Sequence, residues 1–321
     1  MVLGSLYAVR KINIQFNAQD TIEKYIKYLL IFCSSIAVLT TIGIIFSLIF
    51  ESFRFFSQVS LFEFLFSTEW YPFIPIREGQ AAAEGSFGAV PIFAGTFLVM
   101  IVAMCVAAPI GLLTAIYLSE YASQKVRKTV KPLLEILAGI PTIVYGFFAF
   151  VTVAPFVKSF GQSIGIDASP TSALAAGLVM GVMIIPFISS LSDDVMTAVP
   201  QNLRDGSYAM GATKSETVKK VIFPAALPGI VGSILLAVSR AVGETMIVVM
   251  ASGLAANLTM NPLESTSTIT AQIVVILIGD QQFGDPKTQS AFALGISLFI
   301  VTLLLNVIAL SVVKKYREKY E

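Results

Sequence analysis

The stretch DGSYAMGATKSETVKKVIFP, Asp205 to Pro224, is a polar segment of mixed charge between two long apolar segments. Because hydrophobic runs lie on both sides, we expect a loop at a membrane surface. Ser207 to Met210 can form a short helix, and Gly211 suits its left-handed C-cap. Thr213 and Glu216 match a capping box that would begin a second helix. The loop is therefore predicted to have a defined shape that a partner could hold.

The composition indicates an all-α polytopic membrane protein. Of the 321 residues, 56% are hydrophobic and 13% are charged, and the mean hydropathy is +0.82. Soluble domains have about 45–50% apolar and about 25% charged residues. The net charge of +1 gives no basis for binding nucleic acid. The absence of histidine excludes His-based catalysis and His metal sites, so we predict no metal site, and Cys33 and Cys105 are expected to be packing residues.

Six apolar segments are long enough to cross a bilayer, which takes about 20 residues each. We interpret the chain as a single transmembrane domain, residues 1–321, because no soluble portion of useful size is present. The expected helices are Ile26–Phe50, Ile92–Leu118, Leu133–Val157, Ser172–Leu191, Gly229–Gly253 and Ser290–Val313.

Lysine and arginine indicate the orientation of these helices. In a six-helix threading, four clusters fall on one side, and the other side holds only Arg54, Arg77, Lys158 and Lys287. By the positive-inside rule, both termini and the Asp205–Pro224 loop are expected to be cytoplasmic, in a bacterial or archaeal plasma membrane. The clusters are Arg10, Lys11, Lys24 and Lys27; Lys125, Arg127, Lys128 and Lys131; Arg204, Lys214, Lys219 and Lys220; and Lys314, Lys315, Arg317 and Lys319.

The connecting segments follow from this threading. Phe53–Tyr71 is aromatic and holds Trp70, so it is expected to lie in the membrane interface. Ile269–Gly279 is too short to span and is interpreted as an interfacial or re-entrant piece. Pro224 and Pro228 are expected to break the chain before the fifth helix. The segments are a cytoplasmic tail (1–25), an outer loop with an interfacial helix (51–91), a cytoplasmic coupling loop (192–228), a second outer loop (254–289) and a tail (314–321).

Two charges fall within the predicted fifth helix. Arg240 lies about half-way along it, and Glu244 follows four residues later, which would place both on one helical face. They could form a buried ion pair that holds neighbouring helices, or they could face a polar cavity and handle a charged solute. Arginine suits phosphate-like oxyanions because its planar fork donates two parallel hydrogen bonds. Glu135, at the start of the third helix, could reach water or pair with Lys131.

The chain has no nucleotide site of its own. A phosphate-binding loop requires G-x-x-x-x-G-K-[ST], and no glycine in this sequence is followed by lysine. Any ATP-driven work must come from another subunit. No nucleophile–base pair is evident within the helices either, so an enzyme is the least favoured class and no catalytic residue is assigned.

The opening stretch resembles the cytoplasmic signature of ABC-importer permeases. That signature is E-A-A, three residues, Gly, nine residues and I-x-L-P. Asp205, Gly206 and Ser207 stand at E-A-A, Gly211 at the glycine and Val221–Pro224 at I-x-L-P. The spacing is kept, whereas the first three residues depart from the consensus.

Further stretches resemble the PstC-type permease of phosphate-specific importers. The sister PstA-type permease shares the R-x-x-G-E-T core, but Met246 and the F-G-A-x-P stretch favour the PstC type. The matching stretches are Thr68–Trp70 (TEW), Ser86–Thr96 (SFGAVPIFAGT), Tyr117–Tyr121 (YLSEY), Glu135–Gly146 (EILAGIPTIVYG), Ile184–Ile188 (IIPFI) and Ser239–Met246 (SRAVGETM).

The resemblance implies the type I importer permease fold and a set of partners. These are a second, homologous permease, two ATPase subunits that carry ATP and Mg²⁺, and an extracytoplasmic phosphate-binding protein. It also implies that Arg240 and Glu244 are the intramembrane charged pair of the substrate path. The residues implied to dock on an ATPase subunit are Asp205, Gly206, Ser207, Tyr208, Ala209, Met210, Gly211 and Ala212.

The leading interpretation is the membrane channel subunit of an ATP-driven importer of inorganic phosphate. A permease for another oxyanion, such as molybdate or sulfate, would share this architecture. A secondary transporter working alone is also possible from the residues, although no inverted repeat of broken helices is evident.

Overall fold

The computed structural model describes residues 18–72, 85–166, 168–279 and 284–317. The chain divides into two compact units, residues 1–50 and 51–321. The prediction of six membrane-crossing helices is confirmed within the described residues. The helical stretches long and apolar enough to cross a membrane are Ile22–Phe56, Val90–Tyr121, Thr142–Ser163, Ala173–Thr197, Lys214–Val242 and Pro286–Lys314.

The first unit contains one described helix, α2 (Ala18–Phe56), whose residues up to Phe50 belong to it. At about 1.5 Å per residue, the 39 residues of α2 extend for about 58 Å, well beyond the roughly 30 Å hydrocarbon core of a bilayer. Among the described residues of this unit, no other element packs against its apolar side chains. Lipid or another protein surface is therefore needed to cover them.

Helices α4 (Val90–Ile116) and α8 (Ala173–Thr197) form the centre of the second unit, because small residues let their backbones approach closely. A Cβ added to Gly177 would lie 2.5 Å from Cγ1 of Val102, and one added to Gly181 would lie 2.9 Å from the carbonyl oxygen of Ala103. Larger residues would force the two helices apart. The buried side chains around this contact include Val99, Ala103, Ala107, Ala176, Met180, Ile184 and Ile188.

The third membrane-crossing stretch differs from the expected helix over Leu133–Val157. Helix α5 (Gln124–Gly139) ends before Pro141, and Ile140 is extended, with φ −65° and ψ 129°. A residue before proline is pushed out of the helical region, which explains the break. The crossing stretch then consists of α6 (Thr142–Phe148), the π-helical segment η2 (Ala149–Val153) and α7 (Ala154–Ser163). The expectation of one helix across residue 140 is therefore wrong.

The expectation that Pro224 and Pro228 break the chain is also wrong. Helix α10 (Lys214–Thr217), the π-helical segment η3 (Val218–Ile222) and α11 (Phe223–Val242) run on as one helical stretch. Pro224 lies in the first turn of α11, directly after the wider π turn, and Pro228 lies inside α11. At such positions a helix continues at the loss of a backbone hydrogen bond.

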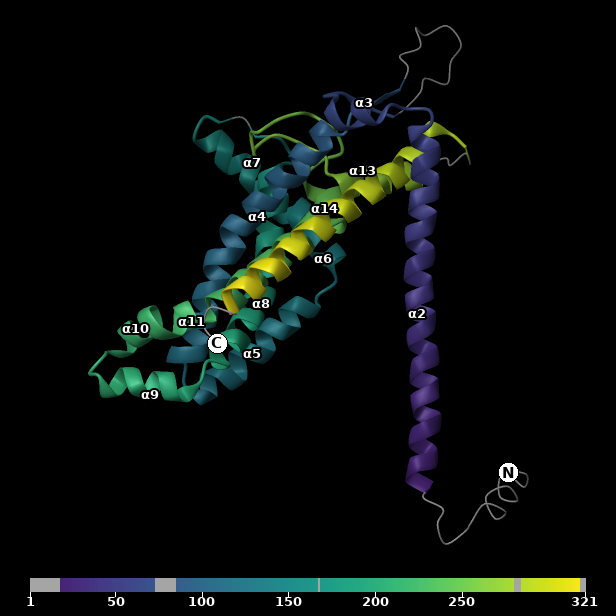
Figure 1. The fold of residues 1–321 in the computed structure, drawn as a ribbon. Coiled ribbons are helices and arrows are strands. Elements are labelled where there is room, and N and C mark those ends of the chain that lie inside the picture. The colour runs from purple at the N-terminus through teal and green to yellow at the C-terminus, as the bar shows by residue number, and fades with distance from the viewer. Residues whose placement is uncertain (1–17, 73–84, 167, 280–283, 318–321) are drawn as a thin grey trace, which may run out of the picture. The chain divides into compact units, whose positions relative to one another are not determined.

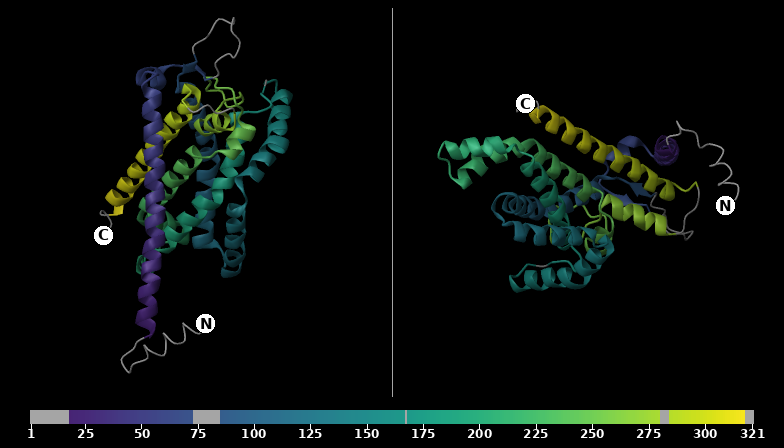
Figure 2. Two further views of the ribbon diagram at one scale, coloured as in Figure 1. Left: turned by 90° about the vertical axis from the view of Figure 1, so that its right-hand side faces the viewer. Right: turned by 90° about the horizontal axis from the view of Figure 1, so that it is seen from below.

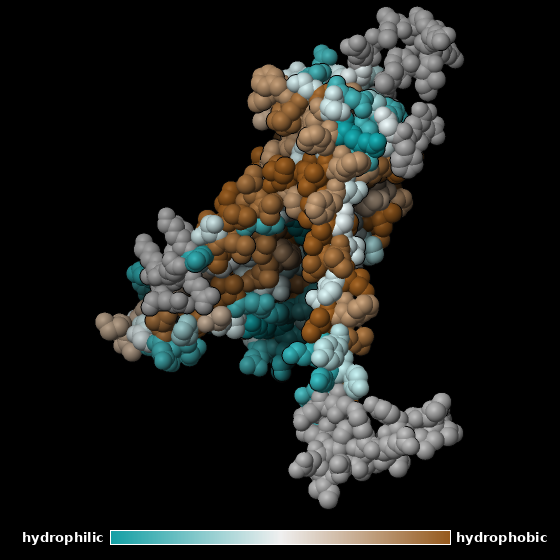
Figure 3. Space-filling view, turned by 45° about the vertical axis from the view of Figure 1, so that its right-hand side comes forward, coloured by the Kyte–Doolittle hydropathy of each residue, from teal (hydrophilic) through white to brown (hydrophobic). Residues whose placement is uncertain are grey.

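Figure 1 shows α5, α9 (Gln201–Ala209) and α10 at one end of the second unit, and α3 (Leu61–Phe66), α7 and α13 (Ile269–Ile278) at the other. Helix α14 (Pro286–Arg317) runs beside α11, as the views in Figure 2 show. On the face in Figure 3, hydrophobic side chains form a broad band across the middle of this unit. The prediction that residues 269–279 are too short to span is confirmed by the ten residues of α13.

The end with α3 is closed by an aromatic cluster. Strands β1 (Trp70–Tyr71) and β2 (Ser86–Phe87) pair antiparallel, with Trp70 opposite Phe87. The ring of Phe87 lies edge-to-face with those of Phe55 and Trp70, at centroid distances of 5.3 and 6.1 Å. Trp70 is 7% exposed and its Nε1 donates to Oε1 of Gln272 on α13 at 3.0 Å. Trp70 therefore packs inside the protein, where its polar edge finds a partner. The expectation that Phe53–Tyr71 lies in the membrane interface stays a prediction.

Candidate functional site

Arg240 lies in the last turn of α11 and its side chain is exposed. Its guanidinium carbon lies 5.6 Å from the centroid of the Phe187 ring on α8, which is within cation–π range. Among the residues that the structure describes, no carboxylate forms an ion pair with Arg240. The side chain thus presents an uncompensated positive charge inside a membrane-crossing stretch.

Glu244 lies beyond the end of α11, in the break Gly243–Thr245 that separates it from α12 (Met246–Ala251). The residue is 9% exposed. Its backbone amide donates to the carbonyl oxygen of Ala241 at 3.2 Å, and its own carbonyl accepts from the hydroxyl of Thr270 at 2.6 Å. This second bond fixes the break against α13.

The expectation that Arg240 and Glu244 share one helical face is wrong, because the helix ends at Val242 between them. The ion pair weighed from the sequence is also not formed among the described residues. Arg240 therefore lies in the last turn of the fifth crossing stretch, and Glu244 follows it in the break before α12.

The predicted docking loop folds into α9, a glycine turn and α10. Gly211 has φ +82°, so the predicted left-handed cap is confirmed. Thr213 and Glu216 form the predicted capping box in both directions. Helix α9 begins at Gln201, six residues earlier than the predicted Ser207. The Met210 side chain is 88% exposed beside the turn, which makes this edge of α9 available to a partner.

The remaining predicted docking residues lie along α9 and its turn. Asp205 accepts from Nε2 of Gln201 at 3.1 Å. The Ser207 hydroxyl lies 2.9 Å from the hydroxyl of Thr217, the last residue of α10. The amide of Ala212 donates to the carbonyl of Ser207 at 3.2 Å. Gly206, Tyr208, Ala209 and the others complete a single continuous surface segment.

A second charged cluster joins α5 to α8. Asp193 is 1% exposed and accepts from Nη2 of Arg127 at 2.9 Å and from Nζ of Lys131 at 3.0 Å. Lys131 also reaches Asp194 at 3.0 Å. The hydrogen bond to Asp194, together with that to Asp193, raises the pKa of Lys131 above its usual value. Among the described residues Lys131 pairs with these two aspartates and not with Glu135, so of the two alternatives considered for Glu135, pairing with Lys131 is not formed.

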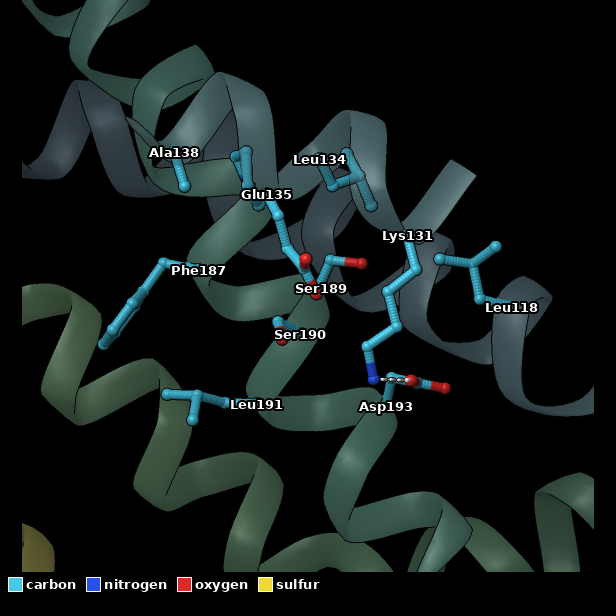
Figure 4. Close-up of a pocket in the computed structure, with 11 residues that line it drawn as sticks. Leu118, Lys131, Leu134, Glu135, Ala138, Phe187, Ser189, Ser190, Leu191 and Asp193 are labelled. Carbon is cyan, nitrogen blue, oxygen red and sulfur yellow. Dashed lines mark hydrogen bonds and ion pairs between the residues drawn. The ribbon is translucent and has the colours of Figure 1, made fainter. Parts of the chain in front are cut away.

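This cluster borders a cavity of about 210 Å³ between α5 and α8. In Figure 4, the Glu135 side chain extends from α5 toward the part of α8 that carries Ser189 and Ser190. The Ser189 hydroxyl is buried and has no hydrogen-bond partner among the residues that the structure describes. The other lining residues are mainly apolar: Leu118, Leu134, Ala138, Pro186, Phe187 and Leu191.

A third contact was missed from the sequence. Arg204 on α9 pairs with Glu120 in the π-helical segment η1 (Tyr117–Tyr121), which extends α4. The sequence contains a signal for such pairs, because the acidic residues Glu120, Asp193 and Asp194 flank apolar helices next to the basic clusters. Sequence spacing alone does not say which of the basic residues each one meets.

Cys33 and Cys105 are free cysteines and both are exposed on this single chain, so the expected packing role stays a prediction for contacts outside the chain. Within the described ranges, no group of three or more His, Cys, Asp or Glu residues is arranged to hold a metal ion.

Comparisons with known proteins place the chain in a family. Residues 107–318 match the model of "Binding-protein-dependent transport system inner membrane component". The chain is 35% identical over 246 residues to the "Probable ABC transporter permease protein YqgH" of Bacillus subtilis, covering 77% of this chain and 75% of that protein. It is 32% identical over 263 residues to the "Phosphate transport system permease protein PstC" of Mesorhizobium japonicum, covering 77% of each.

A solved structure agrees with this at the level of fold. It is a bacterial alginate ABC transporter in complex with an alginate pentasaccharide-bound periplasmic protein. The matched chain has a TM-score of 0.61 and 15% identity, covering 93% of this chain and 97% of that one. The fold is thus that of ABC importer permeases, and the chain belongs to the family of binding-protein-dependent transport system inner membrane components.

Proposed function

We propose that this chain is the membrane channel subunit of an ATP-driven importer of inorganic phosphate. The observation that carries the proposal is Arg240 at the end of a membrane-crossing helix, where no carboxylate of the described residues pairs with it and its guanidinium suits an oxyanion. The similarity to permeases that are named for phosphate transport supports the choice of phosphate over molybdate or sulfate.

In this proposal Arg240 and Glu244 belong to the substrate path. The guanidinium donates to the phosphate oxygens, and the cation–π contact with Phe187 holds the side chain when no substrate is bound. The Glu244 carboxylate accepts a hydrogen bond from a protonated phosphate oxygen. An anion therefore meets one donor group and one acceptor group beside the Gly243–Thr245 break.

The energy for import comes from partners. The family and the solved neighbours support an assembly of permease, ATPase and extracytoplasmic binding protein. We assign this chain a second, homologous permease, two ATPase subunits that hold ATP and Mg²⁺, and a phosphate-binding protein. Residues Asp205–Ala212 on α9 and its turn dock in a groove of one ATPase subunit.

The substrate role is tested by Arg240→Gln in the assembled transporter, with radiolabelled phosphate uptake into proteoliposomes as the measurement. Loss of a charged hydrogen bond is expected to lower uptake at least about tenfold. Arg240→Lys should retain part of the uptake, because the charge stays but the fork is lost. The control Lys158→Gln removes a positive charge from α7 and should leave uptake unchanged.

Normal uptake by Arg240→Gln would contradict the assignment of this residue. Competition with sulfate and molybdate in the same vesicles tests the substrate. If sulfate or molybdate inhibited the uptake of labelled phosphate as strongly as unlabelled phosphate does, the assignment of phosphate as the preferred substrate would be contradicted.

A further inference from the structure

Helix α9 is poorly held by apolar packing. None of its residues, Gln201–Ala209, is buried. The hydrogen bond between Ser207 and Thr217 ties it to α10, which continues through η3 into α11. A force applied at the Gly211 turn can therefore reach α11 along this helical stretch, whereas α4 and α8 need another contact.

Arg204 provides such a contact. Its Nη1 donates to Oε1 of Glu120 in η1, and its Nη2 donates at 2.8 Å to the carbonyl oxygen of Met196 in the last turn of α8. The two side chains are 11% and 5% exposed, respectively. One guanidinium thus joins α9, the end of α8 and the extension of α4.

The geometry of this contact favours a stiff connection. The backbone link from α8 to α9 passes through Val199 and the extended residue Pro200, so by itself it could act as a hinge. Arginine's planar fork has fixed donor directions, and a water-poor pair is screened little by salt. A second attachment away from the hinge prevents α9 from rotating about it.

The two elements that Arg204 reaches are the central ones of the second unit. Helices α4 and α8 contact each other along their length through the small residues described above. Movement passed to either is therefore passed to both. Phe187, which contacts Arg240, is carried on α8.

We propose that Arg204 and Glu120 are positioning residues for transport coupling: their buried ion pair transmits the movement of α9 to the α4–α8 pair. This inference rests on the proposed docking role of α9. Neither residue contacts substrate or ATP. Their effect is on how much transport each hydrolysed ATP supports.

The experiment uses the complete transporter, with this chain carrying Arg204→Gln or Glu120→Gln. Phosphate uptake and ATP hydrolysis are measured in the same proteoliposomes. We expect the ATPase subunits to remain bound and basal hydrolysis to persist, while phosphate transported per ATP falls about tenfold, within the usual range of coupling between sites. The matched control is Lys220→Gln, which removes one positive charge from the same hairpin. Its pair with Glu216 is solvent-exposed, at 75% and 47%, so transport per ATP should stay within about twofold.

A second variant covers the case in which these substitutions prevent folding. Glu120→Cys and Arg204→Cys are combined in a chain in which Cys33 and Cys105 are replaced by serine. A short bis-methanethiosulfonate reagent forms a disulfide with each thiol, releases methanesulfinate and restores the attachment without charge, so coupling should rise on cross-linking and fall when a reductant cleaves the disulfides. A purely structural role would not respond reversibly in this way.

Transport per ATP within about twofold of the parent in Arg204→Gln would overturn the inference, as would a cross-linked pair that stays uncoupled. The proposed function fails by a different result, namely no phosphate uptake by the parent transporter. Hydrolysis stimulated by the binding protein still reports coupling in that case, so the two failures are distinguishable.

Discussion

At the scale of single residues, the break after α11 separates two charges that the sequence places one helical turn apart. Arg240 ends up exposed and Glu244 at 9% exposure. The sequence identifies these residues because charges inside an apolar run are costly. It does not reveal that Gly243 ends the helix between them, since glycine is also common within membrane helices.

Glu244→Gln is expected to lower phosphate uptake about tenfold without changing assembly. The carboxylate accepts a hydrogen bond from hydrogen phosphate, whereas an amide presents a donor as well as an acceptor. Uptake in proteoliposomes and co-purification of the ATPase subunits measure the two effects. Glu69→Gln, an exposed carboxyl near β1, is the control. Unaltered uptake in Glu244→Gln would remove this residue from the substrate path.

At the scale of elements, the conformation of the proposed docking turn at Gly211 depends on residues that are close together in the sequence. The capping box at Thr213 and Glu216 and the left-handed Gly211 depend on residues within a few positions of each other. Both were predicted correctly for that reason. The length of α9 was underestimated because its first residues carry no comparable signal.

Gly211→Ala is expected to weaken coupling, because a residue with a Cβ is strained by about 1–2 kcal/mol in the left-handed conformation. Gly139→Ala is the control, because it makes the same substitution outside the proposed docking segment. Gly139 lies at the end of α5 and an added Cβ meets nothing within 4 Å, so alanine should be neutral or favourable. Phosphate transported per ATP is the measurement. A loss in Gly139→Ala equal to that in Gly211→Ala would refute strain as the cause.

At the scale of the whole molecule, hydropathy is sufficient to predict six membrane crossings, because each is a long uninterrupted apolar segment. Contacts between residues that are far apart in the chain could not be predicted from hydropathy or local patterns. The hydrogen bond from Trp70 to Gln272, about two hundred residues later, could not be inferred from the local pattern around Trp70. The ion pair of Arg204 with Glu120 likewise depends on which helix ends meet in space.

The proposed orientation, with both termini in the cytoplasm, predicts which surfaces a reagent reaches in intact cells. In a chain without its native cysteines, Glu264→Cys in the outer loop should react with a membrane-impermeant maleimide. Lys128→Cys on α5 should react only after the cells are permeabilised. Both side chains are exposed, so burial cannot account for a difference. Labelling of Lys128→Cys in intact cells would contradict the predicted orientation.

The π-helical segment η3 also sets an angular relationship along the fifth crossing. The hydrogen bonds of a π turn enclose one residue more than those of an α-helical turn. Each residue of an α-helix advances the side-chain direction by about 100°. The five residues Val218–Ile222 therefore set the rotational phase between α10, beside the docking turn, and Arg240 at the far end of α11. If the segment adopted the regular α-helical pattern, the side-chain directions at its two ends would rotate relative to each other about the helix axis, so this segment determines which way Arg240 faces relative to the Gly211 turn.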